Sequence, residues 1–240
     1  MSWKEWLKKF RKKSSNVGYC CDCCGVEVFD YPVRRLCEPC EQGMTKNVAY
    51  ICDKCGRATL TEGLCLACKS LPPVFEKGVS PFVYHNTVAG MINRMKTTAP
   101  YLAHYFGEKI VDLLRKKGNA EDCVVTFVPL GKERLRQRGY NQAELLAETV
   151  ADGLGLPLCE TMVCVGEKGM QKHLSAAVRA KNVQGMYRVI DRKAVKGKTV
   201  LLIDDVMTTG ATGNECAARL KKAGANKVYF VTAASLPERR

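Results

Sequence analysis

Residues 200–212 decide the fold of this chain, and they read Val200-Leu201-Leu202-Ile203-Asp204-Asp205-Val206-Met207-Thr208-Thr209-Gly210-Ala211-Thr212. The first four form a continuous apolar run, which is typical of a strand that helices cover on both faces of a parallel sheet. The run ends in two adjacent carboxylates, and a hydroxyl-rich turn then opens a helix. Open α/β sheets bind ligands at the carboxyl ends of their strands. The stretch therefore predicts an α/β fold with a binding site directly after this strand.

The turn over residues 208–212 has the composition of a monophosphate site. Thr208, Thr209 and Thr212 supply hydroxyl groups, and Gly210 lets the backbone approach a ligand closely. The helix that is predicted to begin near residues 211–213 adds unpaired backbone N–H groups and the positive end of its dipole. These groups together suit a bound phosphate.

The two acids before the turn would repel a phosphate, so they must serve a different part of the ligand. Asp204 and Asp205 can accept hydrogen bonds from two vicinal hydroxyls, or they can hold a hydrated Mg²⁺. A phosphate site preceded by acceptors for a diol is what ribose 5-phosphate requires. The alternative is a pair of solvated acids before a Thr-capped helix. The order of the apolar run, the acids and Thr-Thr-Gly-x-Thr favours the ligand site.

The composition sets outer limits on the chain. Its 240 residues suffice for one ordinary domain and a small one. A formal net charge of +14 favours anionic partners such as nucleotides, nucleic acid or an acidic membrane face, without choosing among them. No apolar run approaches the roughly 20 residues that span a bilayer, and the N-terminus lacks the apolar core of a secretory signal. We therefore expect a cytoplasmic protein.

Cysteine pairs dominate the first part of the chain. Ten of the 14 cysteines precede residue 69, mostly as C-x-x-C pairs, which in a cytoplasmic protein indicate metal binding. Two such pairs can complete a tetrahedral Cys₄ zinc site. Because Cys24-Gly25 and Cys55-Gly56 repeat one turn, the segment is an internal duplication that predicts two structural zinc ions. Adjacent pairs give the ligand sets Cys21, Cys24, Cys37, Cys40 and Cys52, Cys55, Cys65, Cys68.

Three features of this zinc module stay open from spacing alone. Cys20 and Cys23 also make a C-x-x-C pair, and Cys21/Cys24 is preferred only because Gly25 then matches Gly56. A crossed pairing of the four knuckles is an alternative, and so is a reduced cluster without metal. The thiolate charge would offset much of the module's basicity, so a nucleic-acid module and a protein–protein spacer remain equally open.

The first residues predict a basic amphipathic helix. Trp3, Trp6, Leu7 and Phe10 fall on one helical face, and the opposite face is rich in lysine and arginine. Such a helix over residues 1–13 could lie on an anionic membrane surface at the inner face of the membrane or dock on a partner protein. The simpler alternative is that its apolar stripe packs on the rest of this chain.

The remainder of the chain alternates between strand and helix patterns. Leu71-Pro72-Pro73 is a stiff connector and marks a domain boundary. Strands are predicted over 74–84, 123–128, 156–165, 186–190, 200–203 and 227–234, and helices over 86–96, 100–116, 140–153 and from 212 to 224. This alternation predicts a doubly wound, mostly parallel sheet.

Two further segments are candidates for the same site. A predicted strand ends at Val128, and a turn with Gly131, Lys132, Arg134, Arg136 and Arg138 follows, where cations could neutralise a pyrophosphate and favour its departure. The alternative is a solvated basic turn.

The second segment is the polar stretch over 166–187, which contains Gln171 and Arg179 and suggests a cover over the site. His173 lies in it, but a lone histidine in a loop is more often structural or solvated than catalytic.

These motifs resemble two nested families. Residues 200–212 resemble the phosphoribosyl pyrophosphate (PRPP) signature of type I phosphoribosyltransferases. The double cysteine module, the run Arg138-Gly139-Tyr140-Asn141-Gln142 and the pattern from Gln171 to Asn182 extend the resemblance, to the ComF family, over almost the whole chain. Tyr187 stands where that family usually has another aromatic, and the doubled cysteines at 20–24 depart from a clean knuckle.

The resemblance implies an architecture and roles for the residues. It implies a double zinc ribbon over 16–70 and a phosphoribosyltransferase-like domain over 71–240, and the basic helix that the residue pattern predicts then occupies 1–15. It implies that Asp204 and Asp205 hold the ribose, and that the basic turn is the pyrophosphate loop. The PRPP-binding set then comprises Val206, Met207, Thr208, Thr209, Gly210, Ala211, Thr212, Gly131, Lys132, Arg134 and Arg138.

Two functions follow as hypotheses. The first is an enzyme that binds PRPP with Mg²⁺ and transfers the phosphoribosyl group to an acceptor, for which we see no nucleobase-reading motif. The second is a competence factor that handles single-stranded DNA, with the PRPP site serving regulation, because the family is linked to DNA uptake in competent bacteria. Partners would then include PRPP, single-stranded DNA and proteins of the competence machinery.

Overall fold

The computed structural model describes residues 20–29, 35–48, 50–118, 123–166 and 183–238. It divides into two compact units, Met1–Met44 and Thr45–Arg240. The helix that the sequence predicts over residues 1–15 lies outside the described residues.

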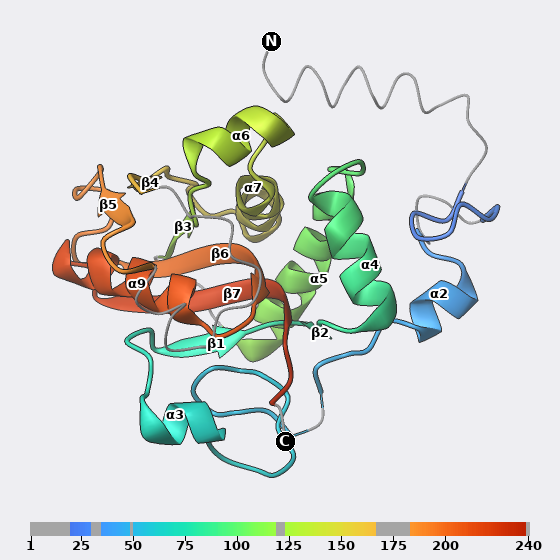
Figure 1. Ribbon diagram of the computed structural model, residues 1–240, viewed down its shortest axis with the longest axis horizontal. Coiled ribbons are helices and arrows are strands. Elements are labelled where there is room, and N and C mark those ends of the chain that lie inside the picture. Colours follow the sequence, from blue (N-terminus) through green and yellow to red (C-terminus); the bar gives the residue numbers. More distant parts are fainter. Residues whose placement is uncertain (1–19, 30–34, 49, 119–122, 167–182, 239–240) are drawn as a thin grey trace. The chain divides into compact units, whose positions relative to one another are not determined.

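A parallel sheet forms the centre of the larger unit (Figure 1). Every strand pair in this sheet is parallel, and β3 is buried at every residue. The apolar runs in the sequence therefore predicted the sheet type correctly. The strand order is β1 (Lys77–Val79), β7 (Lys227–Ser235), β6 (Thr199–Met207) and β3 (Cys123–Phe127), and β2 (Phe82–Val83) also pairs with β7.

Helices cover both faces of this sheet, as a doubly wound fold requires. On one face α5 and α7 pack on each other and against β3, β6 and β7. On the other face α9 packs on β6 and β7, where Leu202 and Phe230 share a buried cluster with Leu220. The helices of the larger unit are α3 (Leu66–Ser70), α4 (Asn86–Met95), α5 (Leu102–Lys117), α6 (Lys132–Arg138), α7 (Gln142–Leu154) and α9 (Ala211–Lys222).

A small antiparallel sheet of β4 (Met162–Cys164) and β5 (Tyr187–Val189) lies beside α9. The sequence predicted a longer strand over 156–165. The residues before β4 instead follow the edge of β3, because the backbone N–H of Val125 donates to Pro157 and Leu158 makes one isolated bridge to Val125.

Two segments differ from the elements that the sequence predicted. The strand pattern over 74–84 is divided into β1 and β2, and Pro81, which has no N–H to donate to a ladder, lies between them. The basic turn after β3 is a helix, α6, which starts after Gly131 and ends at Gly139. Gly139 has φ 78° and donates its N–H to Leu135, which is a typical glycine stop.

The second cysteine cluster belongs to the larger unit, whereas the first lies in the smaller unit with α2 (Glu38–Gln42). The backbones of Gly56 and Gly78 touch, since a Cβ added at Gly56 would lie 2.1 Å from the Gly78 oxygen. The Gly78 N–H also donates to Lys54 at 2.8 Å. The segment that carries the second cysteine cluster, called the second ribbon below, is thus packed directly on β1. The boundary at residue 71 stays a prediction about which parts fold separately.

Among the described residues, no helix combines the length and the apolar character that crossing a bilayer requires.

Candidate functional site

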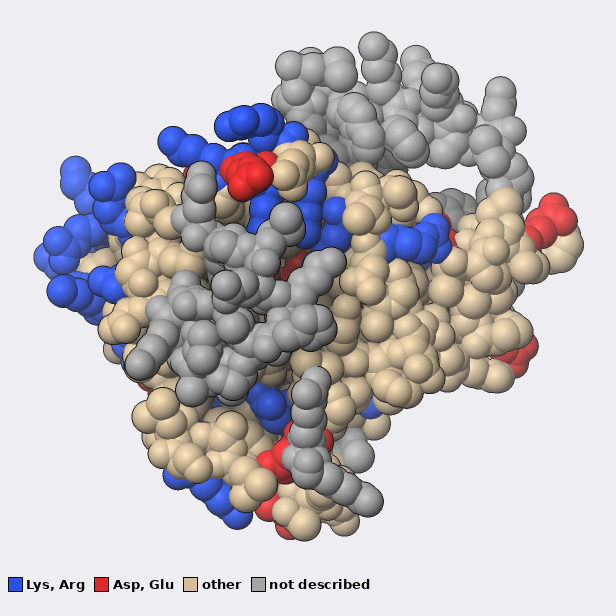
Figure 2. All heavy atoms as spheres, viewed as in Figure 1, with Lys and Arg blue, Asp and Glu red and all other residues tan. Residues whose placement is uncertain are grey.

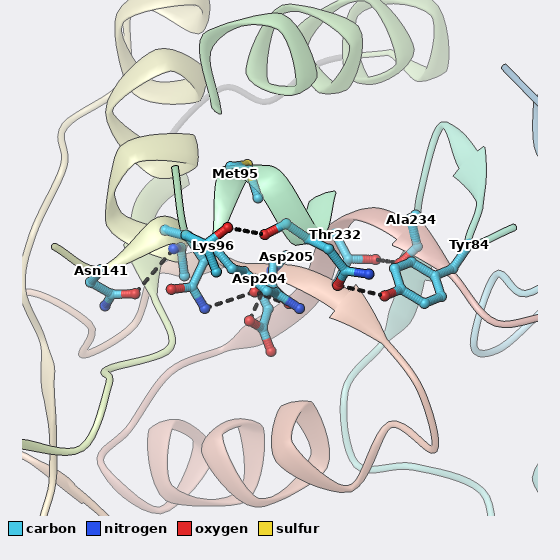
Figure 3. Close-up of polar contacts among 12 residues, drawn as sticks. Tyr84, Met95, Lys96, Asn141, Asp204, Asp205, Thr232 and Ala234 are labelled. Carbon is cyan, nitrogen blue, oxygen red and sulfur yellow. Dashed lines mark hydrogen bonds and ion pairs between the residues drawn. The ribbon is translucent and has the colours of Figure 1, made fainter. Parts of the chain in front are cut away.

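The sequence suggested that the central strand ends at the two acids. In the structure, β6 continues through both acids to Met207. Side chains alternate along a strand, so Asp204 and Asp205 leave β6 on opposite faces. Leu202 packs against α9, which places Asp204 on that face, and Asp205 lies towards α4 and α7. Figure 3 shows Asp205 beside Lys96, with the Asp204 carboxylate pointing away from them.

Asp205 is held by two side chains from the helical layer. Its Oδ2 accepts a hydrogen bond of 2.7 Å from Gln142 Nε2, at the start of α7, and lies 3.3 Å from Lys96 Nζ, just after α4. The residue is only 6% exposed, so this pairing compensates a nearly buried charge. The Tyr140 hydroxyl donates to the Met95 carbonyl at 2.7 Å and joins the same two helices beside the acid.

Asp204 is half-buried, and its Oδ1 accepts the backbone N–H of Asp205 at 2.8 Å. The phenol of Tyr187, on β5, is in its neighbourhood. Burial, together with the negative charge of Asp204 and the thiols of Cys216 and Cys164, raises the pKa of Tyr187. Asp204 lies on the face of β6 that α9 covers, and β5 packs against α9, so the acid and Tyr187 lie on the same side of the sheet. The raised pKa keeps Tyr187 a neutral phenol at physiological pH.

The turn after β6 has the geometry that its sequence predicted. Gly210 has φ 82°, in the left-handed region that favours glycine, and α9 begins at the next residue. The Thr209 hydroxyl accepts the backbone N–H of Ala211 at 3.3 Å, and Thr208 is exposed. Residues 206–212 thus lie at the carboxyl end of the central strand, and the first N–H groups of a 12-residue helix follow the turn.

The cations after β3 lie along α6, and Figure 2 shows lysine and arginine gathered over this helix in the upper part of the view. Lys132 is exposed, whereas Arg134 is half-buried, and its positive charge opposes part of the rise in the pKa of Tyr187. Arg138 Nη1 donates to Gln142 Oε1 at 2.8 Å. Because Gln142 in turn donates to Asp205, the basic helix connects to the acid through one side chain.

The structure adds two residues that the sequence did not single out. Gln142 was part of a motif, but nothing in the sequence indicated that it would contact Asp205. Lys96 follows α4, far from the other site residues in sequence, and no local pattern could reveal it. The predicted cover residues Gln171 and Arg179 lie outside the described residues.

Both cysteine clusters have the donor set and spacing of a Cys₄ site. Within each set, the four sulfur atoms lie within 4.8 Å of one another. The Cys24–Cys37 and Cys55–Cys65 Sγ distances are 3.6 and 3.7 Å. A tetrahedral zinc ion with Zn–S bonds of about 2.3 Å requires sulfurs about 3.8 Å apart, so the residues fit zinc. The sets are those of adjacent knuckles, with Cys21 and Cys24 in the first.

Backbone amides favour the thiolate form of the first cysteine in each set. Burial alone would raise the pKa of Cys52, but the N–H groups of Cys65, Cys55 and Lys54 lower it to about 7. Burial opposes the charge on Cys21 in the same way, and there the amides of Cys24, Cys37 and Cys23 lower the pKa to about 7. Thiolates are the form that binds metal, so both sites could hold a zinc ion.

Comparison with known proteins decides the family. A family model described as phosphoribosyl transferase domain matches residues 141–240. Competence protein ComFC of Bacillus subtilis is 26% identical over 192 residues, 75% of each chain. DNA utilization protein YhgH of Salmonella typhi is 31% identical over 170 residues, 68% of this chain and 74% of that protein. The chain belongs to the ComF family.

This ComF-family protein also resembles Competence protein F of Haemophilus influenzae, with 35% identity over 103 residues, 42% of this chain and 45% of that protein. The family model covers β6, the turn and α9, so the larger unit has the type I phosphoribosyltransferase fold. The two Cys₄ sets are compatible with the double zinc ribbon that the sequence predicted.

Proposed function

We propose that this ComF-family protein binds PRPP with Mg²⁺ at the carboxyl end of β6. The 5-phosphate would lie against the segment from the end of β6 through the turn to the start of α9, which comprises Val206, Met207, Thr208, Thr209, Gly210, Ala211 and Thr212. Asp204 would accept the ribose hydroxyls, and Asp205 would complete the acidic pair from the opposite face. Gly131, Lys132, Arg134 and Arg138 would receive the pyrophosphate, and Gln171 and Arg179 are proposed to cover it.

One observation carries this proposal. A left-handed glycine and the start of a long helix come directly after a central parallel strand whose half-buried acid is Asp204. The N–H groups there suit a phosphate and the carboxylate suits a hydroxyl, and the two lie within one short segment. The match of this same segment to a phosphoribosyl transferase domain supports the assignment.

For an enzyme, the chemistry would be a displacement at C1 of the ribose. The bond from C1 to the pyrophosphate oxygen breaks with its electron pair, and an acceptor atom forms the new bond to C1. Lys132 and Arg134 would stabilise the charge that develops on the leaving pyrophosphate. This chain would contribute mainly positioning and charge compensation.

Calorimetry with PRPP tests the binding step. We expect a dissociation constant between about 1 μM and 1 mM, the usual range of KM values for enzyme substrates, and weaker binding when Mg²⁺ is withheld. Pyrophosphate release is then followed with each common nucleobase, and with none, to separate turnover from binding. Inorganic pyrophosphate alone is the control for simple anion attraction. Absence of binding with Mg²⁺ present would contradict the proposal.

We further propose that both ions of the Cys₄ sets are structural zinc. Residues 1–13 are proposed to reach a membrane surface or proteins of the competence machinery, and a cytoplasmic location stays a prediction.

A second candidate function, binding of single-stranded DNA, rests on a different surface. Six exposed cations lie where β6 and β7 start and α9 ends, opposite to the proposed PRPP site. Figure 2 shows this second group of lysine and arginine at the left edge of the view. Relatives named for DNA utilization and competence support the partner class. The cations are Arg192, Lys193, Lys196, Lys198, Lys222 and Lys227.

The salt dependence of binding tests this candidate. Between 50 and 200 mM salt, the affinity for an oligothymidine should fall about 10- to 100-fold if about four phosphates are contacted. The triple variant Lys193→Gln, Lys196→Gln, Lys198→Gln should flatten this dependence in fluorescence anisotropy. A triple variant elsewhere in the larger unit, Lys46→Gln, Lys54→Gln, Lys69→Gln, removes equal charge and should not. Salt-independent binding by the wild type would exclude this surface.

A further inference from the structure

Arg57 contacts the second cysteine cluster and the phosphate-binding turn at the same time. Its Nε donates to Cys55 Sγ at 3.3 Å, and its Nη2 donates to the Thr208 carbonyl oxygen at 3.1 Å. Cys55 is a member of the Cys₄ set, and Thr208 is the first residue of the turn that precedes α9. One guanidinium group therefore joins two sites that are about 150 residues apart in sequence.

The backbone of Arg57 is fixed by the ribbon and by the sheet. Its carbonyl accepts the N–H of Cys52 at 2.9 Å, within the knuckle turn. The preceding Gly56 has φ +72° and touches the backbone of Gly78 in β1, and its carbonyl accepts the buried Asn47 side chain at 2.7 Å. The backbone of Arg57 is thus fixed, and its side chain is held at both ends of the guanidinium by Cys55 and Thr208.

The contact with Thr208 controls a peptide group of the proposed phosphate site. A peptide unit is planar and trans, so the Thr208 carbonyl and the Thr209 N–H point in opposite directions. When Arg57 holds the carbonyl towards the ribbon, the Thr209 N–H must point away from the ribbon. The turn is anchored before this peptide as well, because the N–H of Leu236 donates to Met207 at 2.9 Å. Rotation of the peptide is thereby restricted.

We propose that Arg57 is a positioning residue that couples the second Cys₄ site to the phosphate-binding turn. A bound zinc ion would fix the position of the Cys55 sulfur, to which Arg57 Nε donates, and would thereby fix the guanidinium that also holds Thr208. Arg57 then orients the Thr208–Thr209 peptide for an anion. By linkage, a sugar phosphate on the turn strengthens zinc binding in the second cluster by the same factor that zinc strengthens sugar phosphate binding. This inference rests on the proposed ribose 5-phosphate site.

Zinc affinity measured with and without ribose 5-phosphate tests the coupling. The full-length zinc-loaded protein is titrated with a competing chelator, and the two zinc equivalents are followed. Coupling energies in proteins usually correspond to factors of about 5–150, so we expect saturating ribose 5-phosphate to raise the affinity of one equivalent at least about 5-fold. The equivalent held by the first cluster should not respond.

Two variants separate positioning from a general structural role. In Arg57→Gln, the ribose 5-phosphate effect on zinc should vanish, and the dissociation constant for ribose 5-phosphate should rise by a similar factor. Arg57→Lys keeps the charge but cannot make both bonds, so it should restore at most part of the effect. Lys69→Gln, an exposed cation of the same ribbon, is the matched control and should keep the wild-type coupling.

The possible outcomes distinguish this inference from the proposed function. If the wild type binds ribose 5-phosphate while zinc affinity is the same with and without it, the coupling is wrong and the binding site stands. That comparison needs no variant, so it remains decisive if Arg57→Gln fails to fold. If the wild type does not bind ribose 5-phosphate at all, the proposed site and the coupling both fall.

Discussion

Replacing Asp204 by Asn should weaken PRPP binding about 10- to 100-fold and leave the melting temperature unchanged within about 2 °C. The carboxylate is half-buried within β6, near its carboxyl end, so the substitution costs hydrogen bonds to the ribose rather than core contacts. A hydrogen bond to a charged group is worth about 1.5–3 kcal/mol, which gives this range of affinity. Calorimetry with PRPP and Mg²⁺ measures the first quantity, and scanning calorimetry measures the second.

Asp205→Asn should behave differently, because Asp205 lies in a nearly buried pair with Lys96 and Gln142. Removing its charge leaves the Lys96 ammonium without its partner and should lower the free energy of unfolding by about 1–3 kcal/mol. Asp152, an exposed acid near the end of α7, provides the matched control for lost charge. Asp152→Asn should change neither the affinity for PRPP nor the free energy of unfolding. Wild-type affinity in Asp204→Asn would remove the ribose assignment.

Replacing Cys52 by Ser should destabilise the larger unit strongly, whereas Cys21→Ser should leave its unfolding unchanged. The four cysteines of the second set share one buried cluster with Phe75, Leu202 and Phe230, so they are part of the main core. Structural zinc contributes several kcal/mol or more to folding, and in a unit of this size each kcal/mol shifts the midpoint by about 2–4 °C. We expect the main transition of Cys52→Ser to fall by about 10 °C or more.

The comparison is matched, because each cysteine is the first of its set, is almost fully buried and accepts backbone N–H groups. Elemental analysis should show that each variant has lost one of the two zinc equivalents. Scanning calorimetry should then show a lower unfolding temperature of the larger unit in Cys52→Ser and an unchanged one in Cys21→Ser. An equal loss of stability in both variants would show that the first cluster also supports the larger unit, and would contradict the division into two units.

The elements nearest the proposed site could be predicted because their signals are local. The apolar run of β6, the glycine at 210 and the helix after it are each specified by neighbouring residues, and the structure confirms all three. The α6 helix was missed because its sequence was interpreted by charge, although a glycine at each end and the helix-forming residues between them favour a helix.

The remaining features depend on contacts between distant residues. Because side chains alternate along a strand, Asp204 and Asp205 must leave β6 on opposite faces. The apolar run in the sequence did not indicate that the strand would extend through both acids. Lys96 lies about 110 residues before Asp205, and Arg57 lies about 150 residues before Thr208. Packing of the second ribbon on β1 depends on Gly56 meeting Gly78, and neither glycine signals this alone.

A crystal structure of the full chain with ribose 5-phosphate and Mg²⁺ is the most direct test of the account. We predict that the phosphate group accepts backbone N–H groups between Thr209 and Thr212, with the sugar hydroxyls within hydrogen-bond distance of Asp204. A phosphate bound elsewhere on the molecule, or a sugar that Asp204 does not contact, would contradict the account.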